Sequence, residues 1–175
     1  MKTKMKHLMA LAMMTATLGL VGCTEKEPAP TPEDNTGEVL YAFHYQGRTL
    51  EAGQTVYFYP TAEDVQEDWS TTTDLFIENT SNANLQSVLK LEKVSGNEAA
   101  NTVLFCLGEN CMSAVCPWTS ETLTITPGVN ENLPLHVQYT PSEVEGTTVY
   151  RITIGKGSSL TNSQTMLLSL SGQAQ

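Results

Sequence analysis

The chain has few basic residues. Nine Lys and Arg stand against 19 Asp and Glu, which gives a formal net charge of −10 at pH 7. A chain with this balance repels polyanions, and the sequence has no basic stripe and no spaced aromatics on which bases would stack. We therefore expect no nucleic-acid partner.

The common catalytic motifs are also missing. The sequence has no Gly-rich phosphate loop, no zinc-protease helix motif and no nucleophile elbow. His44 and His136 each fall in an expected strand, and no motif ties either of them to a Ser or Cys nucleophile. We expect a protein that is not an enzyme, with no catalytic residue, no cofactor and no metal site.

An acidic cluster precedes Trp69. It lacks the alternating oxygen ligands and the central Gly of an EF-hand loop, so the sequence favours a solvated acidic turn over a calcium site. The cluster consists of Glu63, Asp64, Glu67 and Asp68.

Long apolar runs are absent except near the start of the chain. The run from Leu8 to Val21 follows three lysines within residues 1–6 and is too short for a comfortable bilayer span. This anatomy predicts that residues 1–22 are a cleaved signal peptide.

The four residues Leu20-Val21-Gly22-Cys23 resemble the lipobox of bacterial lipoproteins. The resemblance implies cleavage before Cys23, a diacylglyceryl group on its thiol and an acyl chain on the new amino terminus. Two or three acyl chains, at about 0.8 kcal/mol per buried methylene, anchor a protein stably. We expect attachment to the outer membrane through lipid on Cys23. Cleavage also removes three lysines, which leaves 6 basic and 19 acidic residues and a charge of −13.

Residues 23–37 contain no large apolar side chain and are predicted to form a disordered, Pro-rich tether. Its alternating prolines favour polyproline II at about 3.1 Å per residue, a reach of about 40 Å. Glu25 and Glu27 resemble the acidic surface-export signals of Bacteroidetes lipoproteins, although Lys26 separates them. The cell surface is therefore favoured over the periplasmic face.

Residues 38–175 are predicted to form one all-β domain, a single immunoglobulin-like Greek-key β-sandwich. The segment has almost no helical periodicity, and short runs rich in Val, Ile, Thr, Tyr and Phe alternate with turn clusters. The expected strands cover 39–45, 55–59, 75–78, 87–94, 102–107, 122–126, 133–139, 147–154 and 164–170.

Four landmarks in this domain resemble immunoglobulin-like domains of the major-sperm-protein and abnormal-spindle type. The resemblance covers about residues 73–171 and implies a fold, not an activity. The landmarks are a strand that ends at Asn79 before a polar turn, the Pro127-Gly128 turn, the strand that closes in Tyr139-Thr140-Pro141, and Gly146 before a final hairpin.

Similar Bacteroidetes domains carry a short Cys pair that looks like Cys106 and Cys111. The resemblance implies a Cys106–Cys111 disulfide. Cys116 departs from this pair pattern and leaves an odd count once Cys23 is lipidated, so Cys111–Cys116 is the alternative, and we expect the remaining thiol to be buried or to pair with another chain. Closing this loop constrains the unfolded chain by about 2 kcal/mol. The cysteines lack a Cys-x-x-Cys knuckle and have no His near them in sequence, so a metal site is disfavoured.

The segment from Cys106 to Trp118 is the candidate interaction loop. Glu109, Asn110 and Trp118 are its candidate contact residues, and Trp118 is expected either to anchor an interface or to plug one end of the sandwich. We expect a membrane-anchored, non-catalytic lipoprotein that binds or scaffolds an envelope protein or a glycan. The alternatives are a lipid-anchored envelope hydrolase and a subunit of an envelope or secretion assembly.

Overall fold

The computed structural model describes residues 38–96, 103–113, 116–144 and 146–175. The signal peptide, Cys23 and the tether, all predicted within residues 1–37, lie outside the described residues. Within the described ranges, no helix combines the length and the apolar character needed to cross a bilayer.

The described residues are almost entirely strands joined by turns. The helices are α1 (Ala62–Glu67) and the 3-10 helix η1 (Pro141–Glu143). The strands are β1 (Tyr41–Tyr45), β2 (Arg48–Thr49), β3 (Thr55–Phe58), β4 (Ser70–Thr71), β5 (Leu75–Asn79), β6 (Leu85–Ser95), β7 (Leu104–Leu107), β8 (Asn110–Ser113), β9 (Trp118–Thr119), β10 (Leu123–Ile125), β11 (Gly128–Val129), β12 (Leu135–Tyr139), β13 (Thr147–Lys156) and β14 (Thr161–Ser171).

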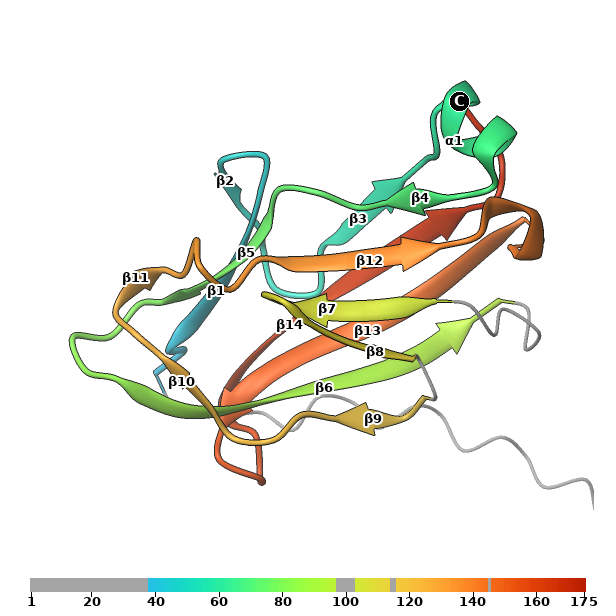
Figure 1. The fold of residues 1–175 in the computed structure, drawn as a ribbon. Coiled ribbons are helices and arrows are strands. Elements are labelled where there is room, and N and C mark those ends of the chain that lie inside the picture. The colour runs from blue at the N-terminus through green and yellow to red at the C-terminus, as the bar shows by residue number, and fades with distance from the viewer. Residues whose placement is uncertain (1–37, 97–102, 114–115, 145) are drawn as a thin grey trace, which may run out of the picture. The chain divides into compact units, whose positions relative to one another are not determined.

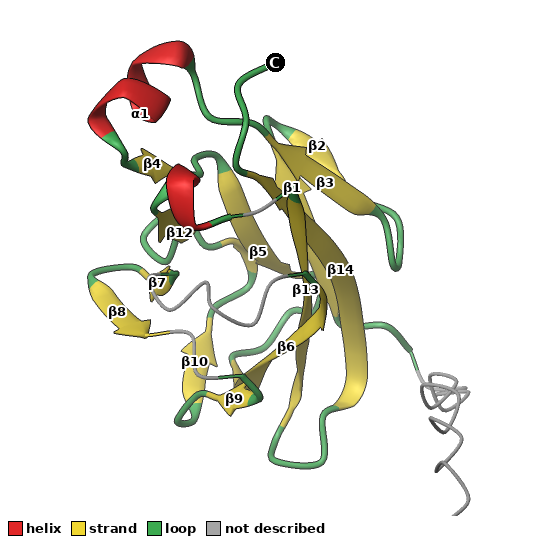
Figure 2. Cartoon of the chain, turned by 90° about the vertical axis from the view of Figure 1, so that its right-hand side faces the viewer, coloured by secondary structure: helices red, strands yellow, loops and turns green. Residues whose placement is uncertain are grey.

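These strands form three sheets. The β13 sheet has the order β10-β6-β13-β14-β3, with β9 also paired to β6. The β12 sheet has the order β4-β12-β7-β8, and the β1 sheet has the order β11-β5-β1-β2. The strand pairs are antiparallel except for β3 with β14. Both views show the β12 sheet facing the β13 sheet across the core (Figures 1 and 2).

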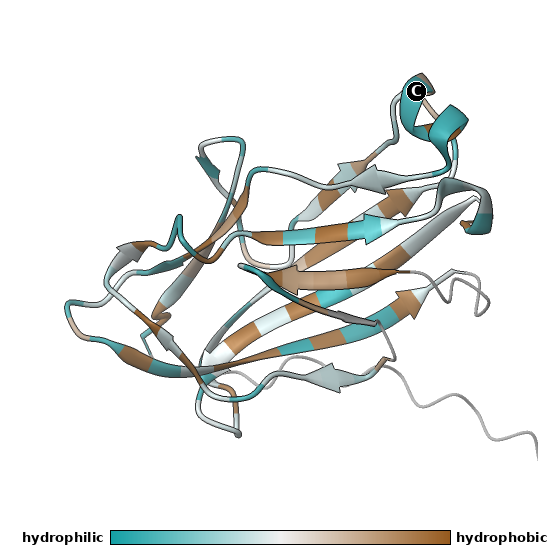
Figure 3. Cartoon of the chain, viewed as in Figure 1, coloured by the Kyte–Doolittle hydropathy of each residue, from teal (hydrophilic) through white to brown (hydrophobic). Residues whose placement is uncertain are grey.

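The core is built from alternate residues of facing strands. On β12, Leu135, Val137 and Tyr139 are buried, while the residues between them are less so. The same period of two gives β12 and β13 their alternating apolar bands in Figure 3. The rings of Phe105 on β7 and Tyr150 on β13 meet edge to face at 5.1 Å, which joins the two sheets.

Two buried asparagines hold the turns on which the family resemblance rests. The Asn79 amide donates to the carbonyl of Ile125 at 3.0 Å, and its side-chain oxygen accepts from the backbone N–H of Ser81 at 2.9 Å. Asn130 donates to the carbonyl of Gly128 at 2.9 Å. A buried amide without hydrogen-bond partners would lower the stability of the fold. Each of these side-chain amides therefore favours the turn conformation that supplies its partners. The landmarks encode turn geometry rather than chemistry.

Each of the nine expected strand segments lies on a strand, so that prediction is confirmed. The sequence did not reveal β2, β4, β8, β9 and β11, which are two to four residues long. A run this short does not show a period of two, and it becomes a strand only because a neighbour offers hydrogen bonds to it. Two of them, β8 and β9, overlap the segment from Cys106 to Trp118 that the sequence predicts as an interaction loop.

Candidate functional site

The strand β3 is an edge strand of the β13 sheet, and among the described strands it pairs only with β14, in parallel. The N–H of Leu167 donates to the carbonyl of Gln54 at 2.9 Å. The N–H and C=O groups of successive residues in a strand point to alternate sides. The backbone groups of Gln54, Val56 and Phe58 therefore point to β14. Those of Thr55 and Tyr57 point to the open side. Among the described residues, these outward groups have no hydrogen-bond partner. The sheet therefore has an unpaired edge at β3.

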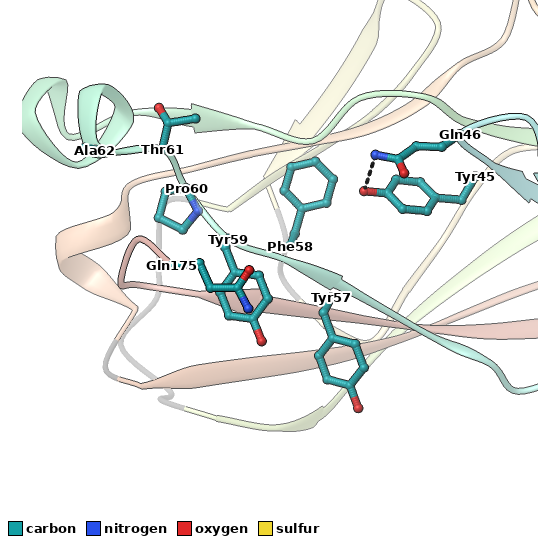
Figure 4. Close-up of a pocket in the computed structure, with 9 residues that line it drawn as sticks. All are labelled: Tyr45, Gln46, Tyr57, Phe58, Tyr59, Pro60, Thr61, Ala62 and Gln175. Carbon is teal, nitrogen blue, oxygen red and sulfur yellow. Dashed lines mark hydrogen bonds between the residues drawn. The ribbon is translucent and has the colours of Figure 1, made fainter.

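Aromatic side chains flank this edge on both faces. Tyr57 and Tyr59 are 62% and 41% exposed, and they point to one side of β3 (Figure 4). Phe58 points to the other side, where its ring meets that of Tyr45 at 6.3 Å, edge to face. Strand alternation produces this arrangement from three consecutive aromatics.

A surface groove of about 580 Å³ lies along the edge. In a chain with a net charge of −10, none of the groove's lining side chains is charged. The groove therefore offers aromatic surface and neutral hydrogen-bonding groups. Its lining consists of Tyr45, Gln46, Tyr57, Phe58, Tyr59, Pro60, Thr61, Ala62 and Gln175.

The β1–β2 turn fixes one end of the groove. Gln46 and Gly47 have φ values of 49° and 72°, which is the conformation of a two-residue hairpin turn. The amide of Gln46 donates to the hydroxyl of Tyr45 at 3.2 Å. Burial, followed by the negative charge of Asp74, raises the pKa of Tyr45 above its usual value. The Tyr45 hydroxyl therefore stays protonated and remains a possible donor at neutral pH.

The helix α1 fixes the other end. Pro60 follows β3, and Thr61 begins a capping box in which its hydroxyl accepts from the N–H of Asp64 at 3.1 Å. The carboxylate of Asp64 in turn accepts from the N–H of Thr61 at 2.7 Å. Asp68 accepts from the N–H of Ser142 at 3.0 Å. Two members of the acidic cluster thus hold local structure.

The cysteines pair as preferred from the sequence. Cys106 and Cys111 lie opposite each other in the β7–β8 hairpin, with Cα atoms 4.0 Å apart, and form a disulfide. Gly108, at a φ of 59°, makes the turn between them. The alternative pairing of Cys111 with Cys116 is wrong. Cys116 is a half-buried free thiol, and burial is the main reason that its pKa is raised.

The expected interaction loop from Cys106 to Trp118 is not one loop. Glu109 and Asn110 are exposed at the tip of the β7–β8 hairpin, in the β12 sheet. Trp118 lies on β9, pairs with Leu91 on β6 and packs half-buried against the core. Backbone pairing to two different sheets therefore separates the candidate contact residues. Of the two expected roles, the core role fits Trp118.

His44 has a partner within its own sheet. Its Nε2 lies 2.6 Å from the carboxylate of Glu78, across the β1–β5 pair. His136 lies on β12 opposite Cys106 of β7.

Sequence reasoning placed Thr55 to Tyr59 in a strand but did not single out its aromatics. The run of three aromatics before Pro60 was visible in the sequence, yet a period-of-two pattern predicts one buried face and one polar face. The side chains of Tyr57 and Tyr59 are exposed because β3 is an edge strand. The sequence carries no signal for that position.

No protein-family model and no curated protein matches the chain. Among solved structures, the chain is similar to the N-terminal domain of PorA, with 16% identity and a TM-score of 0.51. That match covers 77% of this chain and 99% of the other. The described domain is an immunoglobulin-like β-sandwich. At this identity, the likeness concerns the fold alone.

A second similar structure is the ASH / PapD-like domain of human CEP192, PapD-like domain 7. It is 12% identical with a TM-score of 0.44, and the match covers 87% of this chain and 96% of that one. The immunoglobulin-like sandwich predicted from the strand pattern and the turn landmarks is confirmed.

Proposed function

We propose that the protein is a lipid-anchored, non-catalytic domain that binds an extended segment of another cell-envelope protein along the open edge of β3. The observation that carries this proposal is the unpaired edge with exposed aromatics on it. A bound peptide strand would pair with the outward N–H and C=O groups of Thr55 and Tyr57. Strand addition of this kind takes its affinity from main-chain hydrogen bonds and its specificity from alternate side chains.

The flanking side chains suit such a segment. Successive residues of an added strand point to opposite faces, so they would meet Tyr57 and Tyr59 on one face and the Phe58–Tyr45 pair on the other. Tyrosine is favoured at interfaces because it combines a large apolar area with a polar group. Because none of the groove's lining side chains is charged, we expect the bound segment to carry apolar or small polar residues.

A non-catalytic role is favoured by how the described reactive groups are used. His44 is paired with Glu78, and Cys106 is joined to Cys111. The lipobox supports anchoring, and the tether of residues 23–37 would hold the groove away from the bilayer, accessible to a neighbour.

A crosslinking experiment tests the binding surface. In the full chain in its bacterial host, benzoylphenylalanine at Tyr57 should capture a protein, and the same probe at Val129 should not. Val129 is a matched control because it is 42% exposed and lies on β11, in the β1 sheet. A captured species that contains glycan and no peptide by mass spectrometry would contradict the proposal.

Two proline substitutions test the edge itself. Thr55→Pro removes one outward N–H and leaves the bonds to β14, so the domain should fold and capture at Tyr57 should be lost. Val56→Pro removes a ladder N–H and should lower stability instead. If Thr55→Pro folds and still captures the same partner at undiminished yield, strand addition is wrong.

The anchor is tested separately. Labelled palmitate should be incorporated into the wild-type chain and into Cys116→Ser, but not into Cys23→Ser, which should leave the membrane fraction. Protease shaving of intact cells then reports the membrane face. Retention of label by Cys23→Ser would refute the lipobox assignment.

A further inference from the structure

Three side chains with metal-binding atoms converge on the outer face of the β12 sheet. Cys106 and Cys111 are directly opposite each other, and His136 is opposite Cys106 on the neighbouring strand. The alternate residues Phe105, Leu135 and Val137 are buried in the core, so the two cysteines and His136 share the other face. The two sulfurs and an imidazole nitrogen all lie within 4.8 Å of one another.

We propose that reduction of the Cys106–Cys111 disulfide creates a binding site for one thiophilic divalent cation of the zinc class. The ligands are the two sulfurs and His136, and water occupies the fourth position. In a tetrahedral zinc centre, ligand bonds of about 2.0 to 2.3 Å place neighbouring ligand atoms about 3.6 to 3.8 Å apart. The three ligand atoms all lie within 4.8 Å of one another. The two sulfurs are bonded in the disulfide, at about 2.05 Å, so after reduction the cysteine side chains must rotate to move them apart to the ligand spacing.

The backbone already holds all three ligands. The β7–β8 register fixes the two cysteines, and the β12–β7 register fixes His136 beside Cys106. Two thiolates and an imidazole select soft or borderline ions such as zinc, whereas calcium and magnesium require oxygen ligands. Cys116 is not part of this cluster.

The chemistry balances with a dithiol as the reductant. The dithiol supplies two electrons and two protons, becomes a disulfide itself and leaves Cys106 and Cys111 as thiols. Attack is expected at Cys111, which is exposed, while Cys106 is fully buried. Metal binding then displaces the two thiol protons, and the neutral imidazole of His136 contributes a lone pair. The cation itself keeps its oxidation state.

Cobalt titration tests the site, with Co²⁺ as the spectroscopic probe. The full chain is purified in detergent, reduced with a trialkylphosphine, freed of phosphine and titrated without oxygen. We expect one Co²⁺ per chain, with thiolate charge-transfer and tetrahedral visible bands that Zn²⁺ abolishes by competition. The oxidised protein should show neither band.

Variants separate this site from other binding. His136→Ala keeps the disulfide during folding and should weaken Co²⁺ binding by more than about 100-fold, beyond the effect usual for an outer-shell partner. His44→Ala, Cys23→Ser and Cys116→Ser should leave the spectrum unchanged. Circular dichroism of each reduced protein must match that of the oxidised chain. The proposal would be overturned if the reduced protein loses its fold or gives no Co²⁺ bands. It would also be overturned if the His136→Ala variant binds Co²⁺ as tightly as the wild type.

Discussion

The edge strands β8 and β3 of this domain are held in different ways. The edge strand β8 of the β12 sheet is covalently crosslinked to its neighbour β7 by a disulfide, whereas β3 at the edge of the β13 sheet has only its ladder to β14. Proteins usually protect an open edge with charged residues, proline or a covering segment. The described edge at β3 has exposed tyrosines, and none of the side chains that line its groove is charged. The contrast indicates that one edge is stabilised and the other is available for pairing.

The largest difference between the two regions should appear in their phenylalanines. Phe105, under the disulfide hairpin, is 2% exposed, so Phe105→Ala should lower the free energy of unfolding by about 3 to 5 kcal/mol. Phe58 is half-buried at the open edge, so Phe58→Ala should lower the free energy of unfolding by about half as much. Urea unfolding of both variants checks this. Equal losses would mean that the open edge is packed as tightly as the core.

Alkaline pH should weaken the region beneath the hairpin. Burial, and secondarily the Cys116 thiol, raises the pKa of Tyr150 to about 12 from the usual 10. Below pH 10 the hydroxyl is protonated in both the folded and unfolded states, and between pH 10 and 12 the unfolded chain loses its proton first. Stability is therefore lost as pH rises through this window, by roughly 2 to 3 kcal/mol in total.

Urea midpoints at pH 9, 10 and 11 measure that loss. Tyr150→Phe should flatten the pH dependence while it keeps the ring contact with Phe105. Tyr41 and Tyr139, whose pKa values burial also raises, should leave a residual slope in this variant. An unchanged slope would assign the alkaline effect to groups other than Tyr150.

Removal of the disulfide should have the next largest effect. In the entropy model, the double variant Cys106→Ser, Cys111→Ser should lose about 2 kcal/mol, because the loop it opens is short. Thermal unfolding of oxidised wild type and the double variant measures the difference. Cys116→Ser is the matched control and should be close to wild type. A neutral result would show that strand pairing alone holds β8 on the sheet.

The smallest change in stability is expected at the open edge. The double variant Tyr57→Ala, Tyr59→Ala should alter the free energy of unfolding by less than about 0.5 kcal/mol, because both side chains are largely exposed. Partner capture should nevertheless fall at least about tenfold, a loss of about 1.4 kcal/mol in binding. If stability falls by several kcal/mol instead, the tyrosines belong to the fold rather than to a binding surface.

Local pattern predicted much of this architecture. The strand expected at 133–139 contains β12, whose apolar and polar residues alternate from Leu135 to Tyr139 as its burial does. The polar turn expected after Asn79 is present, and the side-chain amide of Asn79 holds it. The pairing of Cys106 with Cys111 followed from a family resemblance. The short strands β8 and β9 were missed, and with them the separation of Asn110 from Trp118, because a strand of two to four residues depends on its neighbour.

The sequence by itself determined which residues face the core, since side chains on a strand alternate wherever that strand lies. It also carries the run that ends in Cys23 and resembles a lipobox, whose modification stays a prediction. Tertiary structure alone decided that β3 lies at an edge, paired with β14 more than a hundred residues later, and that His136 stands beside Cys106. Strand order depends on contacts between distant segments, whose loop-closure cost is offset only when the whole core assembles. Both proposed sites depend on that order.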